Sequence, residues 1–274
     1  MSNITASDVN KLRKSTGAGI MDCKKALVEA NGDFDLAIEN LRKKGQKVAA
    51  KRADRDSSEG AVIAKVNDAN DTGIIISLNC ETDFVAKNES FVALANQIAT
   101  IALSANTKDE LLSSDFENMS VQEKLIEQTG VIGEKLEIGS FERISSEFVG
   151  SYIHAGNKIA TIVGLSNSFD GASEVAKNVS MQAAAMNPVA LDENGVSKDV
   201  IEKEIEIAKD QLRAEGKPEA MLDNIAKGKL KKFFKENTLV NQAFIKDNKL
   251  SVTDYVKSVN SECSITDFKR SALV

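Results

Sequence analysis

The chain has 274 residues, of which 42% are hydrophobic and 28% charged, so it can form one large or two to three small domains. This balance excludes a disordered chain, and no apolar run reaches the roughly eighteen residues that a membrane-spanning helix needs. The net charge of −6 is uneven: residues 1–55 carry 12 Lys or Arg against 7 Asp or Glu, whereas the remainder carries 23 against 34. A basic first segment can bind nucleic acid or an acidic protein surface, but the acidic chain as a whole is a poor nucleic-acid binder, and we expect no direct nucleic-acid contact.

Two features favour a cytoplasmic protein. Residues 1–5 contain neither the basic region nor the apolar region of a signal peptide. The cysteines Cys23, Cys80 and Cys263 are odd in number and far apart, which fits a reducing compartment better than a disulfide scaffold. We therefore expect a cytoplasmic location and no membrane partner.

The first 45 residues predict three short helices with a small core. Thr5 or Ser7 can cap the first helix, and Asp33 can cap the third, which we expect to end near Gly45. The second helix carries apolar side chains at helical spacing: Met21, Cys23, Ala26 and Leu27. Residues 47–60, rich in charge and serine, predict a helical or flexible linker that separates this head from the rest.

One order of elements, strand, turn, strand and Ala-rich helix, occurs in residues 61–103 and again in residues 149–186. The repeat indicates two related α+β subdomains, in which small side chains let a helix pack closely on a sheet. The expected strands span 61–66, 73–78, 149–154 and 159–165, and the expected helices span 91–103 and 172–186.

Five further segments complete the prediction. Residues 108–130 should be helical, and residues 134–144 alternate enough to form a strand. Residues 197–235 predict two antiparallel helices that form a short coiled-coil spur. The chain should close with a helix at 252–259 and a strand at 263–268.

Together these elements predict an α+β fold with antiparallel sheets and four units. We expect a three-helix head with its linker at 1–55 and an N-terminal core subdomain at 56–145. A C-terminal core subdomain should span 146–196 plus 236–274, with the helical hairpin inserted at 197–235.

The sequence offers little for catalysis, and we expect no catalytic residue, metal or cofactor. Thr16-Gly17-Ala18-Gly19 lacks the Lys-Ser or Lys-Thr that would follow in a nucleotide-binding loop. His154 is the only histidine, and the cysteine spacing fits no zinc motif. Cys80, His154 and Asp83 nominally suit a thiol protease, but a cysteine at the end of an apolar strand is better explained as a buried, inert thiol.

The loop at residues 79–88 stands out because the hydrophobic pattern does not require it. It leads from an apolar strand into a polar turn, and the bulky Phe84 lies within that turn. Such a Phe is either a lid on the local core or a recognition anchor, and composition alone does not decide between the two.

Two stretches resemble the signature motifs of the elongation factor Ts family. They are residues 12–27, LRKSTGAGIMDCKKAL, and residues 79–88, NCETDFVAKN. Shorter similarities follow at residues 154–159 and 228–233, so the resemblance runs through almost the whole chain in order.

Members of that family are guanine nucleotide exchange factors for elongation factor Tu, a GTPase of bacterial translation. The resemblance implies a ubiquitin-associated-like (UBA-like) head, two α+β core subdomains and an inserted coiled-coil hairpin. It implies that Asp83 and Phe84 enter the GTPase domain beside its magnesium and phosphate site. The head would dock on the same domain, and the second subdomain on another. The residues carried over are Thr82, Asp83, Phe84 and Val85 for the exchange loop, and Arg13, Asp22, Lys24, His154 and Gly156 for partner binding.

Two other functions stay open at this point. A passive adaptor would bind a protein or nucleic acid through residues 1–55 without changing nucleotide exchange. A hydrolase built on Cys80 would require a reactive thiol. Self-association is left open as well.

Overall fold

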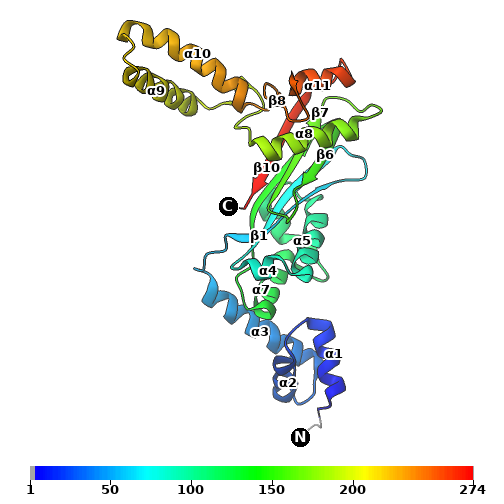
Figure 1. Cartoon of the computed structure of the whole chain (residues 1–274). Coiled ribbons are helices and arrows are strands. Elements are labelled where there is room, and N and C mark those ends of the chain that lie inside the picture. Colours follow the sequence, from blue (N-terminus) through cyan, green and yellow to red (C-terminus); the bar gives the residue numbers. More distant parts are fainter. Residues whose placement is uncertain (1–3, 274) are drawn as a thin grey trace.

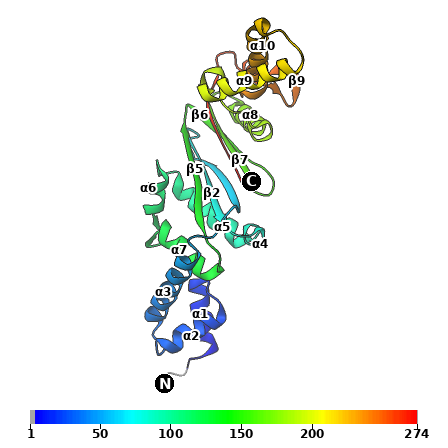
Figure 2. The same cartoon turned by 90° about the vertical axis from the view of Figure 1, so that its left-hand side faces the viewer.

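The computed structural model describes residues 4–273, and the molecule is elongated (Figure 1). A helical head lies at one end, two sheets with their covering helices form the middle, and a pair of long helices projects at the other end (Figures 1 and 2). The segment considered above for a targeting signal begins in residues outside the described range.

Three helices form the head: α1 (Ala6–Thr16), α2 (Ile20–Glu29) and α3 (Phe34–Arg52). Thr5 caps α1 in a reciprocal capping box and Asp33 caps α3, which confirms the predicted helix starts. The head core is small and consists mainly of Val9, Leu12, Cys23, Ala26, Leu27 and Ala37.

The prediction that the third helix ends near Gly45 is wrong. Helix α3 continues to Arg52 and crosses α7 (Val121–Ile132), so that Gly45 is buried against Gly130. A Cβ atom built on Gly130 would lie 2.4 Å from the Cα atom of Gly45. The head is therefore joined to the core through a packed helix, and only residues 53–58 of the expected linker lie outside both α3 and β1.

The first sheet has three antiparallel strands in the order β1–β2–β5. They are β1 (Glu59–Val66), β2 (Thr72–Cys80) and β5 (Glu137–Ser145), and helix α5 (Glu89–Ala102) packs on one face. The predicted hairpin, helix and third strand are confirmed.

Residues 108–130 do not form the continuous helix that their pattern predicts. Helices α6 (Lys108–Ser113) and α7 are separated by the short strands β3 (Asp115–Phe116) and β4 (Met119–Ser120). The two residues between these strands have φ angles of 53° and 69°, which is the left-handed backbone of a tight hairpin turn.

The second sheet repeats the first, in the order β10–β7–β6. Its strands are β6 (Phe148–Ile153), β7 (Ile159–Leu165) and β10 (Ile265–Ala272). Helix α8 (Ala172–Met186) packs on it as α5 packs on the first sheet, so the predicted repeat of strand, turn, strand and helix is confirmed.

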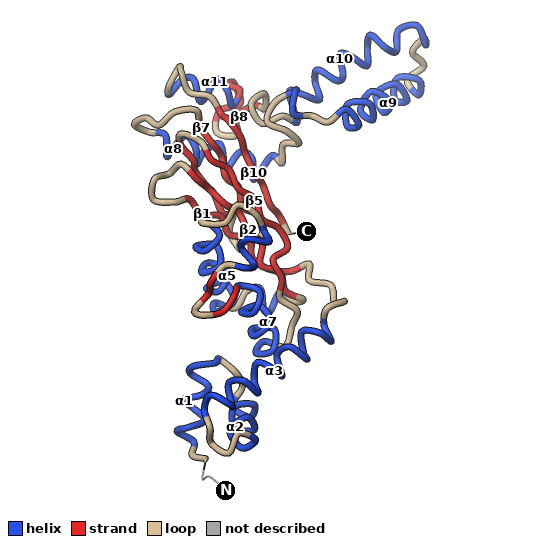
Figure 3. Tube along the Cα trace, turned by 180° about the vertical axis from the view of Figure 1, so that it is seen from behind, coloured by secondary structure: helices blue, strands red, loops and turns tan. Residues whose placement is uncertain are grey.

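The two sheets pack against each other through the faces that their own helices leave uncovered. Ile75 of β2 and Ile162 of β7 lie in the shared cluster between the sheets, whereas Ile74 and Val163 belong to the clusters under α5 and α8. Both central strands are therefore buried on both faces, which explains why their sequences are continuous apolar runs. Figure 3 shows the long strands gathered in the middle of the molecule.

Helices α9 (Lys198–Ala214) and α10 (Glu219–Asn237) form a helical hairpin that projects from the core (Figures 1 and 3). The buried side chains between them are few: Ala208, Leu212, Leu222 and Ala226. The elements around its base are the 3₁₀ turn η1 (Glu193–Gly195), strands β8 (Ala243–Phe244) and β9 (Asp247–Ser251), and helix α11 (Val252–Val259). The β8–β9 hairpin was not predicted.

No helix within residues 4–273 combines the length and apolar character that crossing a membrane requires. In the same range, no group of three or more His, Cys, Asp or Glu side chains is arranged to hold a metal ion.

Candidate functional site

Phe84 lies on a one-turn helix, α4 (Asp83–Ala86), that follows the end of β2. Its side chain is 84% exposed, whereas Val85 and Ala86 pack inward against the core under the first sheet. The interpretation of Phe84 as a lid on the local core is therefore wrong. A large ring carried outward by ordered backbone has the form of a recognition anchor.

The start of α4 is held by hydrogen bonds. Thr82 caps the helix, and its hydroxyl accepts from the N–H of Val85 at 3.5 Å. The carboxylate of Glu134, which follows α7, accepts from the N–H of Glu81 at 3.1 Å and the N–H of Thr82 at 3.0 Å. It also accepts from the Thr82 hydroxyl at 2.6 Å. Three donors on one carboxylate fix the position of the residues that precede Phe84.

Glu81 is bound from the side of the head. Nη1 of Arg52 donates to both carboxylate oxygens of Glu81, at 2.7 and 2.8 Å, and the N–H of Lys135 donates to one of them at 2.7 Å. Burial acts to raise the pKa of Glu81, but these hydrogen bonds outweigh it and lower the pKa. Because Arg52 is the last residue of α3, this ion pair ties the head helix to the start of the α4 turn.

Sequence reasoning did not single out Glu134 or Arg52. Their partners Thr82 and Glu81 lie 52 and 29 positions away in the chain, so only folding joins them. The one signal present was that Glu81 falls inside the motif at residues 79–88.

Asp83 forms an ion pair with Lys87, one helical turn later, at 2.6 Å between Oδ2 and Nζ. The hydrogen bond from Lys87 is the main cause that lowers the pKa of Asp83, so this carboxylate is ionised at neutral pH. The α4 turn therefore carries an ionised carboxylate, paired with Lys87, at the residue before Phe84.

The structure brings the turn that carries His154 and Gly156 close to the α4 turn. Lys158, at the end of this β6–β7 turn, forms an ion pair with Glu59 at the start of β1. In the first sheet Glu59 is the register partner of Cys80, the last residue of β2, which is followed by Glu81, Thr82 and α4. His154 and Gly156 are exposed, so two of the sequence motifs meet at one end of the first sheet.

The three predicted contact residues of the head differ in their surroundings. Arg13 and Lys24 are exposed, whereas Asp22 forms an ion pair with Lys44 that links α2 to α3. Helices α1 and α2, which carry these residues, lie away from α4 (Figure 1), so the structure does not place them at the same site.

The head also exposes large apolar side chains that the sequence pattern did not identify, among them the adjacent pair Ile20 and Met21. Ile20 is 51% and Met21 73% exposed, so the assignment of Met21 to the helix core is wrong. Two residues correspond to about 200° around a helix, so Met21 lies opposite the buried Cys23. The position of Met21 on a helical wheel was therefore the sequence signal that could have identified it as exposed.

Cys80 is buried, and its thiol donates to the carbonyl oxygen of Thr82 at 3.2 Å. Burial is the main cause that raises the pKa of this thiol to about 12. The burial of Cys80 predicted from the sequence is confirmed, and burial with a raised pKa argues against a nucleophilic role for this thiol. His154 instead shares a hydrogen bond between its Nδ1 and the hydroxyl of Tyr152 at 3.0 Å.

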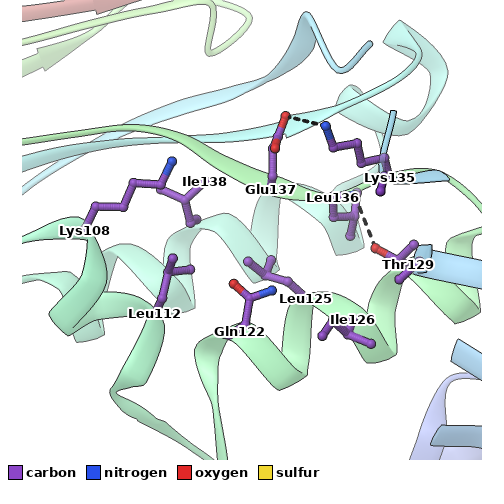
Figure 4. A pocket seen from close by; sticks show the side chains of 12 residues that line it. Lys108, Leu112, Gln122, Leu125, Ile126, Thr129, Lys135, Leu136, Glu137 and Ile138 are labelled. Atoms are coloured by element: carbon purple, nitrogen blue, oxygen red, sulfur yellow. Dashed lines mark hydrogen bonds and ion pairs between the residues drawn. The ribbon is translucent and has the colours of Figure 1, made fainter. Parts of the chain in front are cut away.

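A hollow of about 310 Å³ lies beside the end of α3, between α6, α7 and β5 (Figure 4). Leu125, Ile126 and Ile138 contribute apolar walls, and Lys135 and Glu137 form an ion pair at 3.1 Å along it. None of the site residues predicted from the sequence lines this hollow. It belongs to the packing of the head helix on the core.

Comparison with known proteins identifies the family. The family model described as Elongation factor TS matches residues 81–273. A protein of Christiangramia forsetii named Elongation factor Ts is 69% identical over the full length of both chains, and one of Flavobacterium psychrophilum is 66% identical over the full length of both. A third, from Amoebophilus asiaticus, is 52% identical and covers 97% of this chain and 98% of its own. The chain belongs to the elongation factor Ts family.

Proposed function

We propose that this chain promotes GDP release from elongation factor Tu by inserting the α4 turn, with Asp83 and Phe84, beside the magnesium and phosphate site of that GTPase. In doing so it stabilises the nucleotide-free state of its partner. The family membership supports the exchange activity and the partner. The observation that carries the insertion step is the exposed ring of Phe84, which follows two residues held in place by Arg52 and Glu134.

Exchange by this route is a coupling between two binding events. If the factor binds the nucleotide-free partner more tightly than the GDP-bound partner, it must weaken GDP binding by the same factor. The charge on Asp83 suits this role, because a carboxylate brought next to a phosphate repels the phosphate and competes with it for the metal ion. No chemical step on the factor is needed.

In this proposal the units expected from the sequence have separate roles. Residues 1–55, as a UBA-like head, dock through Arg13, Lys24 and the exposed pair Ile20 and Met21. Residues 56–145 present the α4 turn. The second subdomain, residues 146–196 with 236–274, contacts the partner through His154 and Gly156. The hairpin at 197–235 acts as a coiled-coil spur.

The size of the effect of Phe84 can be bounded. Burying its side chain in the partner contributes roughly 1.5–3 kcal/mol. Since about 1.4 kcal/mol corresponds to a factor of ten in rate, the ring supplies about ten- to a hundredfold acceleration. Larger accelerations need the contribution of Asp83 and of the surfaces on the head and the second subdomain.

The test is release of a fluorescent GDP analogue from elongation factor Tu, chased with excess unlabelled GDP, over a range of factor concentrations. Wild-type chain should accelerate release, and Phe84→Ala should lower the maximal rate by about ten- to a hundredfold. Val259→Ala, which removes an exposed apolar side chain at the end of α11, is the matched control and should keep the wild-type rate. Release unchanged by wild-type chain contradicts the exchange function, and a folded Phe84→Ala variant with wild-type rates contradicts the insertion step.

A further inference from the structure

The ends of α3, from the head, and α7, from the core, lie beside Glu81 and Thr82, the two residues that precede α4. Helix α3 ends at Arg52, whose guanidinium binds the carboxylate of Glu81. Helix α7 ends at Ile132, and after a left-handed cap at Gly133 the chain reaches Glu134, whose carboxylate binds Thr82. Each helix end therefore holds one of two adjacent residues.

Two neighbouring residues after α7, Glu134 and Lys135, bind the two neighbouring residues before α4. Glu134 accepts hydrogen bonds from Glu81 and Thr82, and the next residue, Lys135, donates its N–H to the carboxylate of Glu81. Together with Arg52, these groups form a brace that joins the α3–α7 pair to the α4 turn. Because α3 and α7 touch backbone to backbone at Gly45 and Gly130, the two helix ends cannot move independently over short distances.

Glu134 has the chemistry that this position needs. A carboxylate is an acceptor with two oxygens, and here one oxygen takes both backbone N–H groups while the other takes the Thr82 hydroxyl. Neither N–H has an alternative partner among the hydrogen bonds of residues 4–273. Removing the carboxylate would free the start of α4 and with it the direction of Phe84.

We propose that Glu134 is a positioning residue for nucleotide exchange, which holds Thr82 so that Phe84 points at the partner, and that Arg52 and Glu81 transmit the position of the head to the same turn. This inference rests on the proposed role of Phe84. Glu134 itself touches neither nucleotide nor partner in this account, so its effect on the release rate passes entirely through the ring.

The first test compares Glu134→Ala with Glu134→Gln in the release assay. Ala removes the acceptor of all three hydrogen bonds, and we expect the maximal release rate to fall by about tenfold, part of the roughly ten- to hundredfold that the ring supplies, with little change in the half-saturating concentration. Gln keeps an oxygen for the two N–H groups, and its amide can donate to the Thr82 oxygen, so it should restore most of the rate. Glu147→Ala, at an exposed carboxylate in the β5–β6 turn, is the matched control.

The second test is a double-mutant cycle with Phe84→Ala. If Glu134 acts through Phe84, adding Glu134→Ala to Phe84→Ala should cause no further loss of rate. An additive loss would show a direct or general structural role, and a wild-type rate for a folded Glu134→Ala variant would overturn the proposal. Should Glu134→Ala not fold, Thr82→Val decides by the same cycle, because it removes only the hydroxyl. A wild-type rate for Phe84→Ala alone would instead contradict the proposed function.

Discussion

Replacing Gly130 by Ala should destabilise the chain although Ala is the better helix former. Gly130 lies in α7 and faces Gly45 of α3, and a Cβ atom at residue 130 would stand 2.4 Å from the Cα and 3.3 Å from the N atom of Gly45. These are backbone atoms, which cannot turn aside as the end of a side chain can. The two helices would have to separate at their crossing, loosening the brace that holds the α4 turn.

The magnitude follows from two opposing contributions. Ala in place of Gly inside a helix stabilises by about 0.8–1.0 kcal/mol. Forcing an extra methyl group into a filled contact costs about 1–3 kcal/mol, and a contact of 2.4 Å to backbone belongs at the upper end. We therefore expect a net loss of about 1–2 kcal/mol. Gly228 of α10 offers the matched control, because no atom lies within 4 Å of its Cβ position and the same substitution should stabilise there.

Amide hydrogen exchange followed by mass spectrometry is the suitable assay, because the chain has several modules and a single unfolding transition cannot be assumed. Gly130→Ala should speed exchange in both α3 and α7, whereas Gly228→Ala should slow it in α10. The opposite signs of one substitution in two helices make the test decisive. If Gly130→Ala slows exchange in α7, the close crossing of α3 and α7 is refuted.

Two further predictions concern buried and paired groups. In the folded chain Cys80 should react with thiol reagents at pH 8 on the order of a thousandfold more slowly than an unfolded cysteine, since burial raises its pKa to about 12; rapid labelling of Cys80, located by peptide mapping, would contradict this. The folded-state pKa of Glu81 is lowered, so its ionised form contributes to the stability of the fold. This contribution is fully present above the pKa of Glu in the unfolded chain, about 4.3, and is lost as the pH falls through the folded-state pKa. The difference in unfolding free energy between wild type and Glu81→Gln should accordingly be constant above about pH 5.5 and shrink below about pH 4, and a difference that stays constant into acid would count against the Arg52–Glu81 pair.

Local signals in the sequence predicted most of the elements. Capping residues such as Thr5 and Asp33 predicted the helix starts, because short polar side chains accept hydrogen bonds from the free N–H groups there. The apolar runs of β2 and β7 predicted strands, but the runs alone did not indicate that the two sheets pack face to face. That information depends on contacts such as the one between Ile75 and Ile162, which are far apart in the chain.

The errors at Gly45 and Met21 have different causes. A glycine often ends a helix, but Gly45 lies where α3 crosses α7 against Gly130, so its small size serves a tertiary contact inside a continuing helix. Met21 is apolar, but it lies about 200° around α2 from the buried Cys23, and this local pattern already placed it on the exposed face.

The proposed site could be located from the sequence but its support could not. The motif at residues 79–88 pointed to Phe84, whereas Glu134 became visible only when folding brought it to Thr82. This support matters physically, because a ring on a flexible loop would lose conformational entropy on binding. The net binding free energy from burying the ring would then be smaller. Because Glu134 and Glu81 already hold the turn in the free chain, its conformational entropy is lost during folding and not during binding. The roughly 1.5–3 kcal/mol of Phe84 is then available at the moment of contact, which is why removing the brace should resemble a partial removal of the ring.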